Sequence, residues 1–328
     1  MSEEESTGTV LVALAANLGI AIAKITAGLL GGSSAMLAEG AHSIADTTNQ
    51  VFLLVSLRLS RRPPDETHPF GYGKERFFWS LLAAVGIFVS GAVFSIYEGM
   101  HGLLSGESAD AGYLLAYLVL AVSFVLEGIS WLRAFRQLRG EAHEEDRRIL
   151  EHVRLSSDPT VKTVFSEDTA ALVGLALAAG GLALHQLTGK AYWDAGAAIA
   201  IGVLLAVVAY VLGRDTKEML IGESAPALLR TAMLDALQAH PEVDRVVEVR
   251  TMLVGPDAVL VAGRLDMDDA LNAAGVEDTT DRIAAELQER FPEVVEVYLD
   301  VTSRPGRQVA PTNPDASRPS STRPSATR

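Results

Sequence analysis

Ser34–Ser60 reads SAMLAEGAHSIADTTNQVFLLVSLRLS, and this stretch decides how the rest of the chain is interpreted. His42 and Asp46 lie four residues apart, about one helical turn, so both side chains leave the same face of a helix. Ionisable groups in a helix that is hydrophobic enough to cross a bilayer normally face a bundle interior or a wet cavity. The polar residues that extend this face are Glu39, Asn49 and Gln50.

A histidine and a carboxylate at this spacing form half of a divalent-metal site. The structural alternative is a buried hydrogen bond between His42 and Asp46 that helps to hold two helices together. In a soluble helix the same spacing is common by chance, but its setting in a membrane helix places metal coordination first.

Six apolar runs each have roughly the 20 residues or more that a spanning helix needs. They cover residues 9–30, 34–60, 77–104, 111–138, 163–187 and 191–213. The predicted fold is therefore an α-helical membrane bundle of six transmembrane helices over residues 1–214, embedded in membrane lipid. The N-terminal MSEEES has no basic segment, so we expect no cleaved signal peptide.

The basic residues predict the orientation of this bundle. They gather in the loops after the second and fourth runs, whereas the opposite loops contain only Lys190. By the positive-inside rule, both termini are expected in the cytoplasm. The basic residues of the two loops are Arg58, Arg61, Arg62, Lys74 and Arg76, then Arg133, Arg136, Arg139, Arg147, Arg148, Arg154 and Lys162.

Composition excludes several classes of protein. With no cysteine, the chain has neither disulfides nor thiolate ligands, so histidine and oxygen atoms must hold any metal. A net charge of −14 disfavours nucleic acid as a partner, because phosphate binding needs a basic face. Neither a phosphate-binding Gly-x-x-x-x-Gly-Lys-Ser/Thr nor the His-Glu-x-x-His of metalloproteases is present. We therefore expect neither an ATP-driven pump nor an enzyme.

The fifth run places two adjacent acids, Glu167 and Asp168, in the membrane without a basic neighbour on their own helix. Asp168 would raise the number of protein ligands from two to three. Successive helical residues point about 100° apart, which leaves two arrangements open. In one, the longer Glu167 side chain reaches the ion; in the other, a water or Asn49 is the fourth ligand. The acids of the third and fourth runs, Glu98 and Glu127, are left outside this predicted site.

After residue 214 the pattern changes to that of a small soluble domain. Helical periodicity covers residues 226–240 and 279–291, and strands are expected at 243–253, 259–267 and 294–301. These elements give an α-β-β-α-β domain over residues 215–302. Residues 303–328 are rich in Pro, Ser, Thr and Arg, which predicts a disordered tail.

Together these features resemble the cation diffusion facilitator family, over residues 10–302. The supporting motifs are HPFGYGK at 68–74, EDTAALVG at 167–174, Asp194, and IGESAP at 221–226. The resemblance implies a ferredoxin-like cytoplasmic domain and a homodimeric secondary transporter in the cell (inner) membrane. Such a protein exports divalent metal, commonly Zn²⁺, from the cytoplasm in exchange for protons. An imidazole titrates near pH 6.5, so protons and metal would compete for His42.

Three departures from the family pattern bear on the sites. Val164 stands where the family usually has a His or Asp, and Tyr72 replaces the second His of an extra zinc site with Asp65 and His68. Positions that hold metal-binding His in the soluble domain of some members are Val247, Arg264 and Leu299 here. We therefore expect neither a strong loop site nor a binuclear regulatory site.

Other functions use the same residues. One is an exporter of Mn²⁺, Fe²⁺ or Co²⁺ with the same fold, which a site with one nitrogen and three carboxylates would tolerate. Another is a passive divalent-cation channel or a metal sensor. An exchanger differs from a channel because it can move metal against its own gradient.

Overall fold

The computed structural model describes residues 3–105, 113–144 and 159–302 of the 328-residue chain. The disorder predicted for residues 303–328 lies outside the described residues. The chain divides into two compact units. The first contains Met1–Ala227 with Thr251–Leu260 and Glu293–Val295, and the second contains Leu228–Arg250, Val261–Pro292 and the chain from Glu296 onward.

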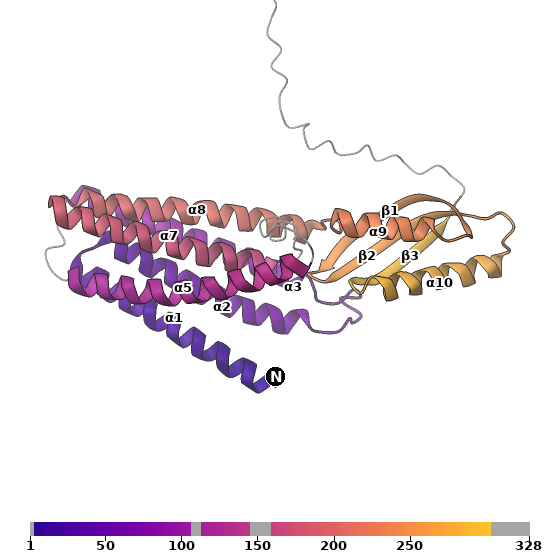
Figure 1. Cartoon of the computed structure of the whole chain (residues 1–328), viewed down its shortest axis with the longest axis horizontal. Helices are drawn as coiled ribbons and strands as arrows, with labels where there is room; N and C mark the ends of the chain where they lie inside the picture. The colour runs from indigo at the N-terminus through magenta and orange to yellow at the C-terminus, as the bar shows by residue number, and fades with distance from the viewer. Residues whose placement is uncertain (1–2, 106–112, 145–158, 303–328) are drawn as a thin grey trace, which may run out of the picture. The chain divides into compact units, whose positions relative to one another are not determined.

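The first unit is built from long helices that run side by side (Figure 1). Their bounds follow the apolar runs of the sequence closely, and α2 begins and ends at the residues predicted for it. The helices are α1 (Glu3–Gly31), α2 (Ser34–Ser60), α3 (Glu75–Gly86), η1 (Ile87–Val93), α4 (Phe94–Ser105), α5 (Tyr113–Glu144), α7 (Pro159–Thr188) and α8 (Tyr192–Ile221). Helix α8 continues past residue 214, where the sequence suggested the end of the membrane part.

Four helical segments in the described part of the chain are long and apolar enough to cross a membrane. They are Glu75–Ser105, Tyr113–Gly140, Phe165–Thr188 and Tyr192–Ile221. Helix α1 contributes a shorter apolar stretch, Asn17–Gly31. Helix α2 contacts α1, α3, η1, α4, α7 and α8, and twelve of its residues are buried. A helix that packs against many other helices can turn polar side chains toward them, which fits the buried polar residues of α2.

The segment Glu75–Ser105 contains a π-helical stretch, η1, between α3 and α4. Small residues let α4 and η1 approach α8 closely. A Cβ atom added to Gly99 would lie 2.7 Å from the carbonyl oxygen of Ala195, and one added to Gly91 would lie 3.0 Å from Leu205 Cδ1. Such close backbone approach through small residues is typical of helix pairs in membranes.

The start of α2 is fixed by a residue from a different helix. Ser33 is the N-cap, and its Oγ accepts a hydrogen bond from Met36 N at 3.2 Å. Asp194 of α8 accepts from Ser33 Oγ at 2.7 Å and from Ala35 N at 3.3 Å. The carboxylate of Asp194 therefore interacts with the amide end of the α2 dipole, and Gly32 makes the preceding turn with a φ of 62°.

The C-terminal elements form a three-stranded sheet with two helices. They are α9 (Ala227–Gln238), β1 (Val243–Gly255), β2 (Ala258–Met267), α10 (Ala273–Arg290) and β3 (Val294–Val301), in the predicted order. The strand order is β1-β2-β3. A two-residue turn joins β1 and β2 as an antiparallel pair.

Hydrogen bonds from Val259 N to Glu293 O and from Thr302 N to Leu265 O make β3 parallel to β2, so the sheet is mixed. Every second residue of β2 is buried, from Val259 to Met267. Such alternation is typical of a sheet with one covered face. The helices α9 and α10 each have buried apolar residues that can cover this face.

The close approach of α4 and α8 can be tested at Gly202. A Cβ atom there would lie 2.6 Å from Ile96 Cγ1 and 2.9 Å from Ala92 O, so Gly202→Ala should destabilise the bundle by about 1–3 kcal/mol. Gly196→Ala is the matched control on the same helix, because no atom lies within 4 Å of its added Cβ. Thermal unfolding of the purified variants in detergent measures the difference. Equal midpoints for the two variants would contradict the packing described here.

Candidate metal centre

A polar cavity of about 150 Å³ lies inside the helical unit. Four carboxylates line it, and they come from three helices: Asp46 from α2, Glu127 from α5, and Glu167 and Asp168 from α7. The uncharged polar residues that line it are Asn17, Ser43, Asn49, Gln50 and Ser130. Because neither Lys nor Arg is among its lining residues, the cavity is strongly acidic.

His42 and Asp46 meet as their spacing predicted. His42 Nδ1 lies 3.5 Å from Asp46 Oδ1, but the two atoms do not form a hydrogen bond. Neither nitrogen of His42 has a hydrogen-bond partner among the described residues, although the residue is only 1% exposed. A buried polar atom without a partner costs about 1–3 kcal/mol. The pair is therefore poor as a structural hydrogen bond, while its free atoms are of the kind that bind cations.

The two acids of α7 both line the cavity, and each is held by an uncharged donor. Asn49 Nδ2 donates to Glu167 Oε2 at 2.5 Å, and Ser130 Oγ donates to Asp168 Oδ2 at 3.1 Å. Glu167 Oε1 has no hydrogen-bond partner in the described structure. Glu127 was left out of the predicted site, yet it shares the cavity. Sequence periodicity on α5 gave no signal for it, because its neighbours in space come from other helices.

The candidate ligands surround the cavity without converging on one point. Within residues 3–105, 113–144 and 159–302, no three His, Asp or Glu side chains lie close enough together to hold one metal ion. The structure thus brings His42 to Asp46, and Asp46 to the cavity that Glu167 and Asp168 also line. A bound ion would have to draw these carboxylates inward or share them with water.

Beside this cavity, a buried ion pair joins α1 to α2. Lys24 Nζ lies 3.0 Å from Glu39 Oε2, and it also donates to Ser43 Oγ at 2.9 Å. Both charged side chains are 0% exposed. Lys24 is therefore ion-paired inside the bundle, although the long side chain of a lysine in a membrane helix can also extend toward the membrane surface.

Residues 10–221 match the family described as the cation efflux transmembrane domain, which is well over half of the chain. The chain belongs to the cation diffusion facilitator family. The match to its membrane domain and the four apolar helical segments make the chain a multi-pass membrane protein.

Several curated proteins of this family are similar to the chain. Metal tolerance protein C4 of Arabidopsis thaliana is 34% identical over 82% of this chain and 58% of its own length. The mitochondrial proton-coupled zinc antiporter SLC30A9 of Mus musculus is 32% identical over 88% of this chain and 52% of its own length. The chain thus spans little more than half of these two relatives. The manganese efflux system protein MneP of Bacillus subtilis is 28% identical over 91% of this chain and 96% of its own length.

In the loop between α2 and α3, the two retained candidate ligands lie near each other, with His68 Nδ1 3.7 Å from Asp65 Oδ1. Asp65 Oδ1 accepts from the backbone nitrogens of Thr67 and His68, at 2.9 and 2.7 Å, and its Oδ2 accepts from Tyr72 Oη at 2.7 Å. The Tyr72 hydrogen bond, followed by the backbone bonds, lowers the pKa of Asp65. The Asp65 oxygens are thus engaged in folding the loop.

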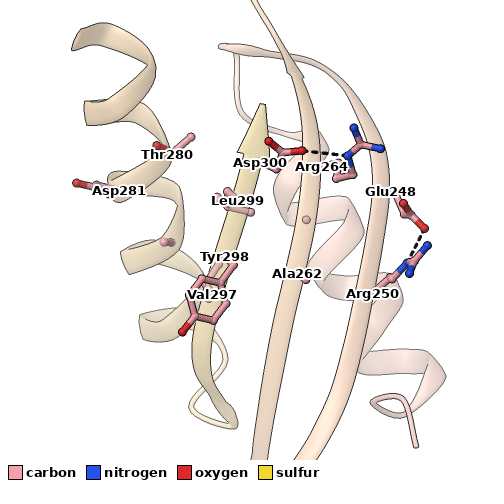
Figure 2. A pocket seen from close by; sticks show the side chains of 12 residues that line it. Glu248, Arg250, Ala262, Arg264, Thr280, Asp281, Val297, Tyr298, Leu299 and Asp300 are labelled. Carbon is pink, nitrogen blue, oxygen red and sulfur yellow. Dashed lines mark hydrogen bonds and ion pairs between the residues drawn. The ribbon is translucent and has the colours of Figure 1, made fainter. Parts of the chain in front are cut away.

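The second unit has a groove of about 650 Å³ that includes two of the positions where some members bind metal (Figure 2). One of them, Arg264, donates from Nε to Asp300 Oδ2 at 3.1 Å, and the other is Leu299. A second ion pair joins Arg250 Nε to Glu248 Oε1 at 2.7 Å. Neither histidine nor cysteine is among the residues that line the groove, and its charged side chains include two arginine–carboxylate pairs.

The Lys24–Glu39 pair predicts a strong dependence of each residue on the other. Lys24→Met alone should destabilise the protein by about 3–5 kcal/mol, because it leaves the buried Glu39 carboxylate without its counter-ion. Adding Glu39→Gln should recover much of this loss, since no buried charge then remains unpaired. A double-mutant cycle of unfolding free energies in detergent measures the coupling. If the two losses simply add, the pair does not stabilise the bundle in this way.

Proposed function

We propose that this protein is a secondary transporter that exports divalent metal cations, with Zn²⁺ as its preferred cargo, in exchange for protons. The observation that carries the proposal is an acidic cavity beside His42 in a membrane protein of the cation diffusion facilitator family. In the described part of the chain, both nitrogens of His42 and one carboxylate oxygen each of Asp46 and Glu167 are buried without a hydrogen-bond partner. In this proposal His42, Asp46 and Asp168 are the metal ligands, and Glu167 is the fourth.

The donor set supports a divalent metal of intermediate softness. One imidazole with several carboxylates suits Zn²⁺, and it also tolerates Mn²⁺, Fe²⁺ and Co²⁺. Among the relatives, one is named as a zinc antiporter and another as a manganese efflux protein. An exporter of Mn²⁺ is therefore the second candidate, favoured by the excess of oxygen donors around the cavity.

Proton coupling follows from the same groups. Metal binding requires a neutral imidazole and ionised carboxylates, so a metal that enters this site displaces protons from it. The exchange of metal for protons needs no second binding site, because the same donor atoms bind either a metal ion or protons. The resemblance to a proton-coupled antiporter is consistent with this arrangement.

The wider architecture is part of the proposal. We infer that α1 and α2 complete a six-span bundle with both termini in the cytoplasm, and that the C-terminal sheet and helices form a ferredoxin-like cytoplasmic domain. A domain of this size with one uncovered sheet face gains stability by pairing, so we also infer a homodimer in the cell (inner) membrane. The molar mass in mild detergent by light scattering tests the dimer.

The transport proposal predicts uphill metal movement. In proteoliposomes, an imposed proton gradient should drive Zn²⁺ against its own gradient, whereas a passive channel cannot do this. Asp46→Ala and Asp168→Ala should each abolish this uptake, because each removes a charged ligand. His42→Asp should keep transport but shift its metal preference toward Mn²⁺.

The matched control for these variants is Asp244→Ala, an exposed acid on β1 outside the helical bundle, which should transport normally. Zn²⁺ movement that only runs downhill would support a channel in place of an exchanger. Normal proton-coupled transport by the Asp168 variant would rule out the proposed ligand set.

Glu167 is expected to bind metal through Oε1, because Oε2 is held by Asn49 while Oε1 has no partner in the described structure. Glu167→Gln should therefore weaken Zn²⁺ binding by about tenfold or more, the loss of one charge-assisted contact. Equilibrium dialysis of the full chain in detergent measures this, with the exposed Glu289→Gln as control. Near-normal binding in Glu167→Gln, with tighter binding in Val164→His, would show that Glu167 is not a ligand.

A further inference from the structure

A second polar cavity, of about 180 Å³, lies at the other end of α2. It is bordered by the end of α1, the start of α2, α4, the end of α7 and the start of α8. A cavity needs about 10–15 Å³ of such space to hold one water, so this one has room for several. The titratable residues that line it are Glu98, His101, His185 and Asp194.

His185 is the residue that points to a ligand. It is 3% exposed, and its Nδ1 has no hydrogen-bond partner among the described residues. The Tyr113 ring stands edge-on to the imidazole, with centroids 6.1 Å apart. An apolar side chain at this position would avoid the cost of burying a polar atom without a partner. The imidazole is therefore better explained by something that binds in the cavity than by stability.

Asp194 is the second donor, and its position is fixed. The residue is 3% exposed, and it accepts hydrogen bonds from Ser33 Oγ and from the backbone nitrogens of Ser34 and Ala35. A carboxylate has about four lone-pair positions, so these three bonds still leave acceptor capacity for a cation. Because all three partners belong to the start of α2, the carboxylate is held in place at the cavity wall.

Both cavities border α2. Leu37 lines the second cavity and Ser43 lines the first, six residues or about 9 Å farther along the helix. Glu39 and His42 fall between these two positions or next to them, and Lys24 donates to Glu39 and Ser43; all three side chains are buried. A cation that moves from the first cavity along α2 past these buried residues would next meet the second.

We propose that the second cavity is a transient binding site for the transported divalent cation, with His185 and Asp194 as its protein ligands. Glu98 and His101 lie at its more exposed side. This inference rests on the proposed function. Since no three His, Asp or Glu side chains converge in the described parts of the chain, the ion keeps part of its hydration shell. Such weak binding suits an exit site, from which the ion must be released.

The test separates the second cavity from the first. In the full chain carrying Asp46→Ala and Asp168→Ala, equilibrium dialysis in detergent should still detect weak Zn²⁺ binding. Adding His185→Gln should weaken that residual binding by about tenfold or more, because one of two protein ligands is lost. The control is His240→Gln, the same exchange at a histidine of the second unit, which should leave the residual binding unchanged.

Residual binding that His185→Gln does not alter, or no residual binding at all, would overturn the proposal. A melting temperature of His185→Gln equal to or above that of the unmodified chain shows that the variant is folded. Should it unfold, His185→Asn takes its place in the same comparison. Failure of the proposed function gives a different result. In that case, Asp46→Ala and Asp168→Ala would not weaken the strong Zn²⁺ binding of the unmodified chain.

Discussion

The helical unit depends on the neutralisation of one buried charge by another. Lys24 and Glu39 form an ion pair at 3.0 Å with both side chains fully buried, and this pair lets α1 and α2 pack against each other along a polar face. Glu39 also reaches α7, because a Cβ atom on Gly174 would collide with its Oε1. Only glycine leaves room for the carboxylate there. Three helices are thus fixed around a single acid one helical turn from His42.

This arrangement explains why a polar helix occupies the centre of the bundle. The α2 segment would be a poor lipid-facing helix, and the four segments with clear membrane-spanning composition do not include it. It contacts six other helical segments, and it turns Glu39 and His42 toward the protein interior. The same packing leaves two polar cavities that border α2. The first cavity is acidic, and the second combines acids with imidazoles.

Residue patterns predicted the elements well where a local signal exists. Strand β3 begins and ends at the predicted residues, Val294 and Val301, because alternation of apolar residues is a local property. Helix α10 begins at Ala273, six residues before the prediction. Its N-cap is Asn272, whose side chain accepts from Gly275 N at 2.9 Å. The Ala-Ala-Gly segment that follows has no apolar periodicity. The N-cap residue was therefore the one sequence signal for the start of this helix.

The site was predictable only as far as single helices define it. Spacing placed His42 beside Asp46, but it could not show that Glu127 lines the same cavity as Asp46. Nor could it show that Asp194 binds the start of α2, where its contact Ala35 is 159 residues away in sequence. Those relations depend on how helices pack against each other. A helical pattern specifies which residues share a face, not which neighbour that face meets.

The charge balance of the first cavity argues for coupling between metal and protons. Four carboxylates line it, and the donors that hold Glu167 and Asp168 are the uncharged Asn49 and Ser130. Lys24, the nearby cation, is paired with Glu39 and is one positive charge beside four cavity acids. Several like charges in a membrane interior are costly unless cations compensate for them. In the exchange proposed above, a divalent ion would supply part of the balance and protons the rest, so loss of one cargo would favour uptake of the other. We infer that exchange is set by this excess of acid, and that adding a fixed positive charge to the cavity would uncouple metal from protons.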